Sequence, residues 1–90
     1  MTESAQARLG RLRHRSMWRG IREMDLILRD FVDHELTGLT AEELDLYEAM
    51  LAESDHDLLA WVAGRADPPE RYASLIARLR HRAVGLTRPG

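Results

Sequence analysis

The stretch IREMDLILRDFVDHE, residues 21–35, decides the fold class of this 90-residue chain. Its large apolar residues recur at steps of three and four, and they are Met24, Ile27, Leu28, Phe31 and Val32. On an α-helix these residues form one stripe, so the spacing predicts a helix over about Ile21–Glu35 with one face in a core. The sequence Leu36-Thr-Gly-Leu39 then breaks the pattern.

The segments on either side also predict helices. Residues from about Ala5 to Met17 carry only a thin apolar stripe among four arginines, which predicts a helix that packs at one edge. Thr40 and Glu43 have the spacing of a capping box and predict a helix with Leu44, Tyr47, Met50 and Leu51 on its apolar face. Ser54 or Asp55 is placed to cap a short helix through Trp61, which Gly64 ends.

The sequence Asp67-Pro-Pro-Glu70 predicts the start of a fifth helix. Asp67 would be its cap and Pro68 would lie in its first turn, where the missing N–H costs nothing. One face would then hold Tyr72, Leu75, Ile76, Leu79 and Ala83. Since no segment alternates with a period of two, we expect an all-α protein, a small five-helix bundle. It would form a single domain over residues 1–84, with a flexible tail at residues 85–90.

Composition excludes several kinds of site. The chain has no cysteine, so disulfides, thiolate metal sites and cysteine nucleophiles are excluded. No run approaches the eighteen or more apolar residues that span a bilayer, and the N-terminal residues lack the apolar core of a signal peptide. We therefore expect a cytoplasmic protein without membrane insertion.

The net charge of −2 hides three blocks of opposite sign. Residues 1–22 carry a net +5, residues 23–57 a net −11 and residues 58–90 a net +4, and every basic residue is arginine. One interpretation is that the blocks neutralise one another across a compact bundle. The basic ends also make nucleic-acid binding a candidate function, because arginine can contact phosphate. However, the acidic middle would repel a polyanion, and no helix has the surface of a recognition element, so we expect no nucleic-acid partner.

The histidines and acids do not form a catalytic or metal-binding pattern. His34-Glu35 lacks the second histidine of an HExxH zinc site. Asp55-His-Asp57 falls at a predicted helix start, where acids favour capping and the helix dipole. The serines have no evident base and orienting group. The sequence therefore predicts a protein that is not an enzyme, with no metal and no cofactor of its own.

Gly20, in the stretch WRGIREMD at residues 18–25, needs an explanation. In a helix it costs about 1 kcal/mol relative to alanine. Arg19 and Glu23 would then be helical neighbours, but such a pair contributes only about 0.3–0.5 kcal/mol. Gly20 either marks the joint between the first two helices or lets the backbone of another protein approach, with Arg19 and Glu23 flanking the contact. Trp18, Arg15 and Arg22 would enlarge that interface, since aromatics and arginine are favoured anchors.

The sequence RGIREMD at residues 19–25 resembles the RGxxE signature of the succinate dehydrogenase assembly factors, the FAD assembly factors of the SdhE family. The similarity continues through "HE" at 34–35, "AEEL" at 41–44 and "DHDLLAW" at 55–61, and it covers roughly residues 8–82. The combination of RGxxE with the Asp-x-Asp-Leu-x-x-Trp run in a chain of this length makes the resemblance specific.

The resemblance implies a chaperone rather than an enzyme. Members of this family bind the flavoprotein subunit of succinate dehydrogenase, and in part of the family that of fumarate reductase, and promote covalent attachment of FAD to it. Arg19, Gly20 and Glu23 are then the expected partner contact, and Arg22 and Asp25 match common neighbours. Trp18 departs from the basic residue or histidine that many relatives carry, which bears on partner range.

Two points qualify what the resemblance implies. Asp55, Asp57 and Trp61 also match the family, and we interpret them as a helix cap and core rather than as a contact. A small helical adaptor or regulator with a different partner would have the same fold, and it is the alternative function.

Overall fold

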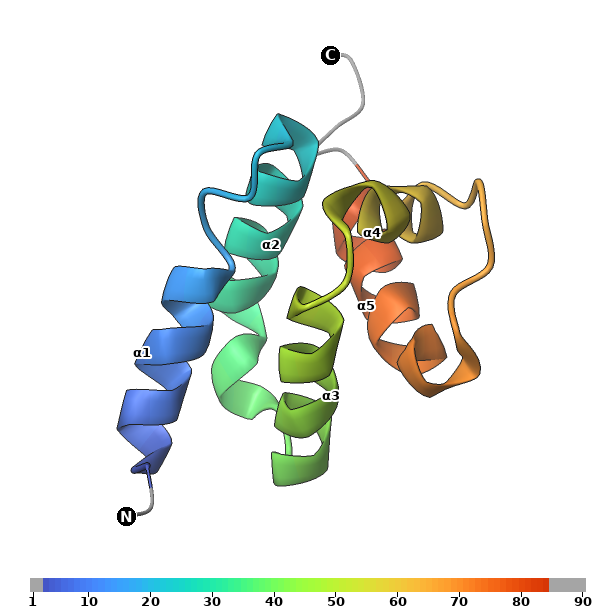
Figure 1. Cartoon of the computed structure of the whole chain (residues 1–90). Coiled ribbons are helices and arrows are strands. Elements are labelled where there is room, and N and C mark those ends of the chain that lie inside the picture. The colour runs from blue at the N-terminus through green and yellow to red at the C-terminus, as the bar shows by residue number, and fades with distance from the viewer. Residues whose placement is uncertain (1–2, 85–90) are drawn as a thin grey trace.

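Five α-helices make up most of residues 3–84, the part of the chain that the computed structural model describes (Figure 1). They are α1 (Ala5–Arg15), α2 (Arg22–His34), α3 (Ala41–Leu51), α4 (Asp55–Val62) and α5 (Ala73–Ala83). Short 3₁₀ turns, η1 (Leu36–Gly38) and η2 (Glu70–Tyr72), follow α2 and precede α5. The predicted all-α five-helix bundle is confirmed. The tail expected at residues 85–90 lies outside the described residues.

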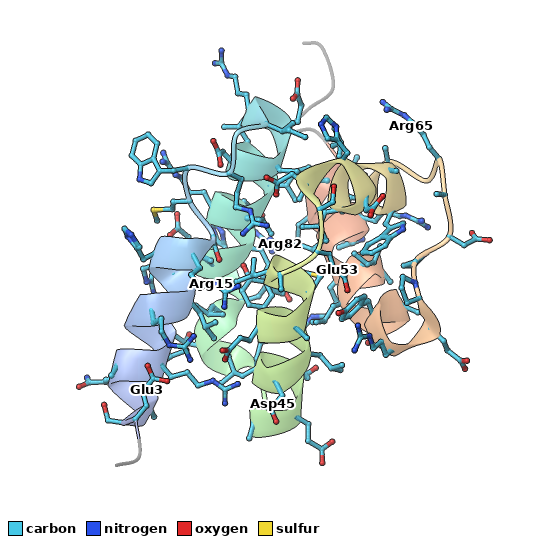
Figure 2. All side chains as sticks on the ribbon, viewed as in Figure 1. Glu3, Arg15, Asp45, Glu53, Arg65 and Arg82 are labelled. Atoms are coloured by element: carbon cyan, nitrogen blue, oxygen red, sulfur yellow. The ribbon has the colours of Figure 1, made fainter. Side chains whose placement is uncertain are left out.

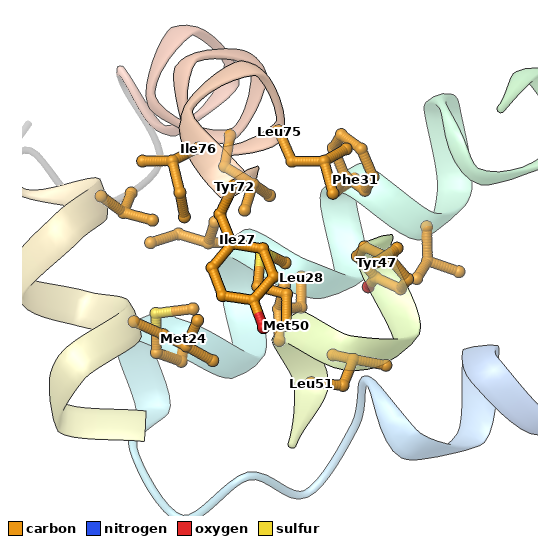
Figure 3. Close-up of a cluster of buried hydrophobic side chains, with 14 of the residues drawn as sticks. Met24, Ile27, Leu28, Phe31, Tyr47, Met50, Leu51, Tyr72, Leu75 and Ile76 are labelled. Atoms are coloured by element: carbon orange, nitrogen blue, oxygen red, sulfur yellow. The ribbon is translucent and has the colours of Figure 1, made fainter. Parts of the chain in front are cut away.

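The predicted apolar stripe of α2 lies at the centre of the bundle. All five of its residues are at most 2% exposed, and they pack against side chains from α3 and α5 (Figure 3). The rings of Phe31 and Tyr47 stack with their centroids 5.5 Å apart, which joins α2 to α3. From the C-terminal side, Leu75 and Ile76 of α5 close the core, as the period of three and four predicts.

Two of the predicted helix ends are confirmed in detail. The Thr40 side chain accepts from the Glu43 N–H, and the Glu43 carboxylate accepts from the Thr40 N–H, so the capping box is complete. At the end of α4, Gly64 has φ +77°, and the N–H of Arg65 donates to Ala60 O over 2.8 Å. Together with the bond from Gly64 N–H to Trp61 O, this is a Schellman motif.

The predicted start of the last helix is wrong. Asp67 caps no helix, residues 67–69 lie outside any helix, and α5 begins only at Ala73, after the turn η2. The reason is the second proline, because a residue that precedes proline is disfavoured in the helical region. Pro68 is such a residue, and Pro69 itself has φ −52° and ψ 144°. The predicted apolar face is nevertheless correct, since Tyr72, Leu75, Ile76 and Leu79 are buried and Ala83 packs partly buried against the core.

Helix α1 packs at the edge, as its thin stripe predicts. Leu12 is its one buried residue, Leu9 packs partly buried against the core, and ion pairs join the helix to α3. Arg8, Arg11 and Arg15 all lie within 4 Å of the Glu48 carboxylate, and Arg8 also reaches Asp45 at 2.6 Å. Figure 2 shows Arg15 at the boundary between α1 and α3. The interpretation that the charge blocks neutralise one another across the bundle therefore holds for this contact.

Within residues 3–84, no helix combines the length and the apolar character needed to cross a bilayer.

Candidate functional site

The connection between α1 and α2, residues 16–21, forms an exposed corner of the molecule. It starts from a fixed point, because Ser16 is fully buried, donates to Leu12 O over 2.7 Å and shares a hydrogen bond of 2.6 Å with the Tyr47 hydroxyl. The chain then reverses through two left-handed residues, Trp18 at φ +58° and Gly20 at φ +95°. L residues rarely adopt this region, and a bulky one such as tryptophan is unusual there.

The backbone of the corner explains the glycine. Gly20 marks the joint between the first two helices, as one of the two interpretations predicts, although the C-cap of α1 is Ser16. A Cβ at Gly20 would meet no atom within 4 Å, so the position is open to solvent. The conformation alone therefore selects glycine, and the same open space is compatible with the approach of another protein.

Arg19 does not lie where the helical spacing places it. Helix α2 begins at Arg22, so Arg19 is in the corner and the pairing of Arg19 with Glu23 as helical neighbours is wrong. The guanidinium of Arg19 turns inward and donates to Asp55 Oδ1 over 2.8 Å, to Leu51 O over 2.8 Å and to Arg15 O over 3.1 Å. One side chain thus links the ends of α1 and α3 to the first turn of α4.

Asp25 also stabilises the corner. Its carboxylate accepts a hydrogen bond of 2.6 Å from the Arg19 N–H, while the N-cap residue of α2, Ile21, offers no side-chain cap. A carboxylate in the first turn also interacts favourably with the positive end of the helix dipole. Arg19 and Asp25 are therefore held in contacts within the chain.

The remaining predicted site residues face solvent. Trp18 is 80% exposed, and Gly20, Arg22 and Glu23 are exposed as well. Arg15 is partly buried against α3, 3.9 Å from Glu48. Trp18 and Gly20 in the corner and Arg22 and Glu23 in the first turn of α2 are thus exposed, whereas Arg15, Arg19 and Asp25 are partly buried.

Sequence reasoning missed two features beside the corner. Leu26 is 41% exposed on α2, one turn after Arg22. Glu23 also lines a cavity of about 360 Å³ together with Leu59, Ala63 and Arg65 from the end of α4. Gly64 signals the helix end that fixes Arg65, but its place beside Glu23 depends on how α4 packs against α2, which the sequence does not reveal.

Two side chains at the contact between α1 and α3 have shifted pKa values. The guanidinium of Arg11 holds the pKa of the Glu48 carboxyl below its usual range. Burial raises the pKa of Tyr47 to about 12, although its hydrogen bond with Ser16 opposes the rise.

In the described residues no three His, Asp or Glu side chains are grouped to hold a metal ion. The corner thus offers an exposed aromatic ring, an open backbone and one charge of each sign, which are means of binding another protein.

Comparison with known proteins gives a consistent result. The family model described as "Flavinator of succinate dehydrogenase" matches residues 10–83. The chain is similar to a FAD assembly factor SdhE of Legionella pneumophila (strain Lens), with 30% identity over 74 residues, 79% of this chain and 94% of that protein.

Mitochondrial relatives match as well. The chain is similar to succinate dehydrogenase assembly factor 2 of Schizosaccharomyces pombe, with 36% identity over 72 residues, and of Mycosarcoma maydis, with 34% identity over 90 residues. These matches cover 80% and 97% of this chain but only 52% and 38% of the relatives, so the chain spans about half of their length or less. With the family model matched over residues 10–83, and with the RGxxE signature at the exposed corner of a five-helix bundle, the chain belongs to the family of succinate dehydrogenase flavinators.

Proposed function

We propose that this protein is an assembly factor that binds the flavoprotein subunit of succinate dehydrogenase and promotes covalent attachment of FAD to that subunit. Family membership supports the proposal, as do the names of the relatives. The observation that carries it is the corner, because Gly20 is open to solvent between an exposed tryptophan and an exposed carboxylate. The flavoprotein of fumarate reductase is a second proposed client.

The predicted site residues in and beside the corner divide into two roles in this proposal. Trp18, Gly20, Arg22 and Glu23 contact the partner, with Trp18 as the apolar anchor and Glu23 as an acceptor of charge-assisted hydrogen bonds. Arg19 is a positioning residue, because its guanidinium is committed to three acceptors within the chain. Asp25 and Arg15 support it, since Asp25 accepts from the Arg19 N–H and the Arg15 carbonyl accepts from its side chain.

The factor contributes orientation in this mechanism. FAD is the group that is attached to the partner, and it is not a cofactor of this chain. By covering part of the flavoprotein, the factor would hold the flavin and the acceptor histidine of the partner in a reactive geometry. The factor supplies no catalytic group, and it leaves the flavoprotein once FAD is attached. The sequence predicts that this takes place in the cytoplasm.

A deletion strain tests the proposal. We expect the flavoprotein subunit to lose its in-gel flavin fluorescence when the gene is deleted, and to regain it with the wild-type gene. Gly20→Asn should not restore it, because an asparagine tolerates a positive φ but fills the open space. Arg29→Glu is the matched control, since Arg29 is exposed on α2 outside the proposed contact.

Affinity capture from native lysate distinguishes the proposal from its alternative. Recovery of the succinate dehydrogenase flavoprotein, reduced by Gly20→Asn, supports the assembly role. Recovery of an unrelated protein in its place, with normal flavin fluorescence in the deletion strain, would show a helical adaptor with a different partner. Recovery of the fumarate reductase flavoprotein tests the second client.

A further inference from the structure

A cavity of about 360 Å³ lies beside the corner and opens to solvent. Glu23 in the first turn of α2 forms one side of it. Leu59, Ala63 and Arg65, at the end of α4 and just beyond it, form the other. Because Glu23 lies two residues beyond the corner, the cavity adjoins the surface around Gly20, although α4 is more than thirty residues away in sequence.

The two charged residues of the cavity differ from most charged residues of the bundle. Along residues 3–84, arginines such as Arg8, Arg78 and Arg82 each pair with carboxylates. By contrast, neither Glu23 nor Arg65 has an ion pair or a side-chain hydrogen bond to any other described residue. The cavity therefore presents one unpaired charge of each sign, with the apolar side chains of Leu59 and Ala63 also lining it.

The backbone beneath Arg65 is fixed. Its N–H donates to Ala60 O over 2.8 Å in the Schellman motif that ends α4. The carbonyl of Trp61 in the same turn also accepts two hydrogen bonds from Arg80, of 3.0 and 2.7 Å. Figure 2 shows Arg65 on the loop after α4, with its side chain directed away from the bundle. A side chain on a fixed backbone loses less freedom when it binds than one on a mobile loop.

We propose that this cavity receives a segment of the flavoprotein partner that carries a basic side chain for Glu23 and a carboxylate for Arg65. The apolar part of the same segment would lie on Leu59 and Ala63. This inference rests on the proposed function, and it extends the contact from the signature in α2 to the end of α4. A free dinucleotide is a poorer fit, because the Glu23 carboxylate would repel its phosphates.

The test measures the affinity of the purified factor for the purified flavoprotein subunit without attached flavin. Arg65→Glu should weaken binding by about tenfold or more, since it places a carboxylate opposite the proposed carboxylate of the partner. Arg65→Gln removes the charge without reversing it and should weaken binding less. Arg29→Glu makes the same charge change about 120° around α2 from Glu23, and it should leave the affinity within about twofold. Added salt should reduce the difference between wild type and Arg65→Glu.

Each outcome decides the cavity contact, the proposed function or both. If wild type binds and Gly20→Asn does not, while Arg65→Glu binds like wild type, the cavity contact is overturned and the proposed function stands. If wild type does not bind the flavoprotein at all, both are overturned. An effect of Arg65→Glu that Arg29→Glu reproduces would indicate general electrostatic attraction, and it would also overturn the cavity contact.

A pairing of Glu23 with Arg65 inside the free factor is the remaining competitor. The melting temperatures of Glu23→Gln, Arg65→Gln and the double variant resolve it. We expect small and additive shifts, as for two unpaired surface charges. A loss that is clearly smaller in the double variant than the sum of the single losses would show that the two residues pair across the cavity, and it would overturn the proposal.

Discussion

Asp55 accepts a hydrogen bond of 2.8 Å from Arg19 Nε, between residues 36 positions apart in sequence. The same guanidinium donates to the carbonyl of Leu51, the last residue of α3, where helical carbonyls lack partners within the helix. The side chains of Arg19 and Asp55 are only 13% and 21% exposed. The signature arginine is therefore part of the fold, and it determines how the corner is presented.

Arg19→Ala should lower the free energy of unfolding by about 2–3 kcal/mol, because it removes charge-assisted hydrogen bonds and leaves the Asp55 carboxylate without its partner. Arg19→Lys should lower the free energy of unfolding by a smaller amount, since an ammonium keeps the charge but lacks the planar guanidinium that reaches several acceptors. Urea denaturation measures both. Arg29→Ala, at an exposed position without a partner among the described residues, should stay within about 0.5 kcal/mol of wild type.

The same variants distinguish a positioning role from a direct contact. If Arg19 positions the corner, Arg19→Ala should lose stability and capture of the flavoprotein together, and Arg19→Lys should recover part of both. An Arg19→Ala protein that unfolds like wild type yet fails to capture the flavoprotein would contradict the positioning role. It would support the direct partner contact that the signature predicts.

Gly20→Ala should cost about 1 kcal/mol of stability, because φ is +95° and L residues are disfavoured there, while the added Cβ meets no atom of the bundle. Gly20→Asn should cost less, since asparagine tolerates positive φ better. Such losses leave a typical domain folded, so any large loss of capture is due to the surface. We expect both variants to weaken capture by about tenfold or more. Weakening that follows the melting temperature alone would make Gly20 a purely structural residue.

The positions of most helices along the chain are predictable because their determinants are local. The apolar stripe of α2 and the Thr40–Glu43 capping box act over one or two turns, and both appear in the structure as expected. The cap signal at Asp67 predicts too early a start for α5, because Pro69 disfavours a helical conformation for the residue before it.

The site was predictable only in part. The RGxxE pattern drew attention to Gly20 and Glu23, and both face solvent. Arg19 was misplaced because α2 begins three residues later than a continuous helix would require, so its side chain follows the corner and reaches α3 and α4. The proximity of Arg65 to Glu23 depends on the packing of α4 against α2, and no spacing in the sequence indicates it.

The two tryptophans should respond oppositely to substitution. Trp18 is 80% exposed at φ +58°, so Trp18→Gly removes little buried area and relieves strain, offset by the greater freedom of glycine in the unfolded chain. We expect a nearly unchanged melting temperature and a loss of capture of about tenfold, because exposed aromatics anchor interfaces. Trp61 is 8% exposed and packs on Tyr72, so Trp61→Ala should lose about 3–5 kcal/mol of stability. Undiminished capture by Trp18→Gly would remove Trp18 from the proposed interface.

Helix α1 should detach at acidic pH before the rest of the bundle unfolds. Its attachment to α3 centres on Glu48, whose pKa the Arg11 guanidinium lowers in the folded state. A lowered folded pKa stabilises the protein above the usual glutamate value of about 4.3, and this stabilisation is lost as the pH falls through the lower folded pKa. Because α1 contributes only Leu12 and the partly buried Leu9 to the core, little apolar burial opposes its release.

Hydrogen exchange measured as protection factors follows each helix separately. Below about pH 4 we expect the amides of α1 to lose protection while those of α2 keep it. Glu48→Gln should show weak protection of α1 already at neutral pH, with little further change on acidification. Asp30→Asn is the matched control, because Arg82 lowers the pKa of Asp30 in a different contact, between α2 and α5. That variant should keep the wild-type pH dependence of α1. If α1 and α2 lose protection together, α1 is an integral part of the cooperative bundle and its ionic contact with α3 does not control its release.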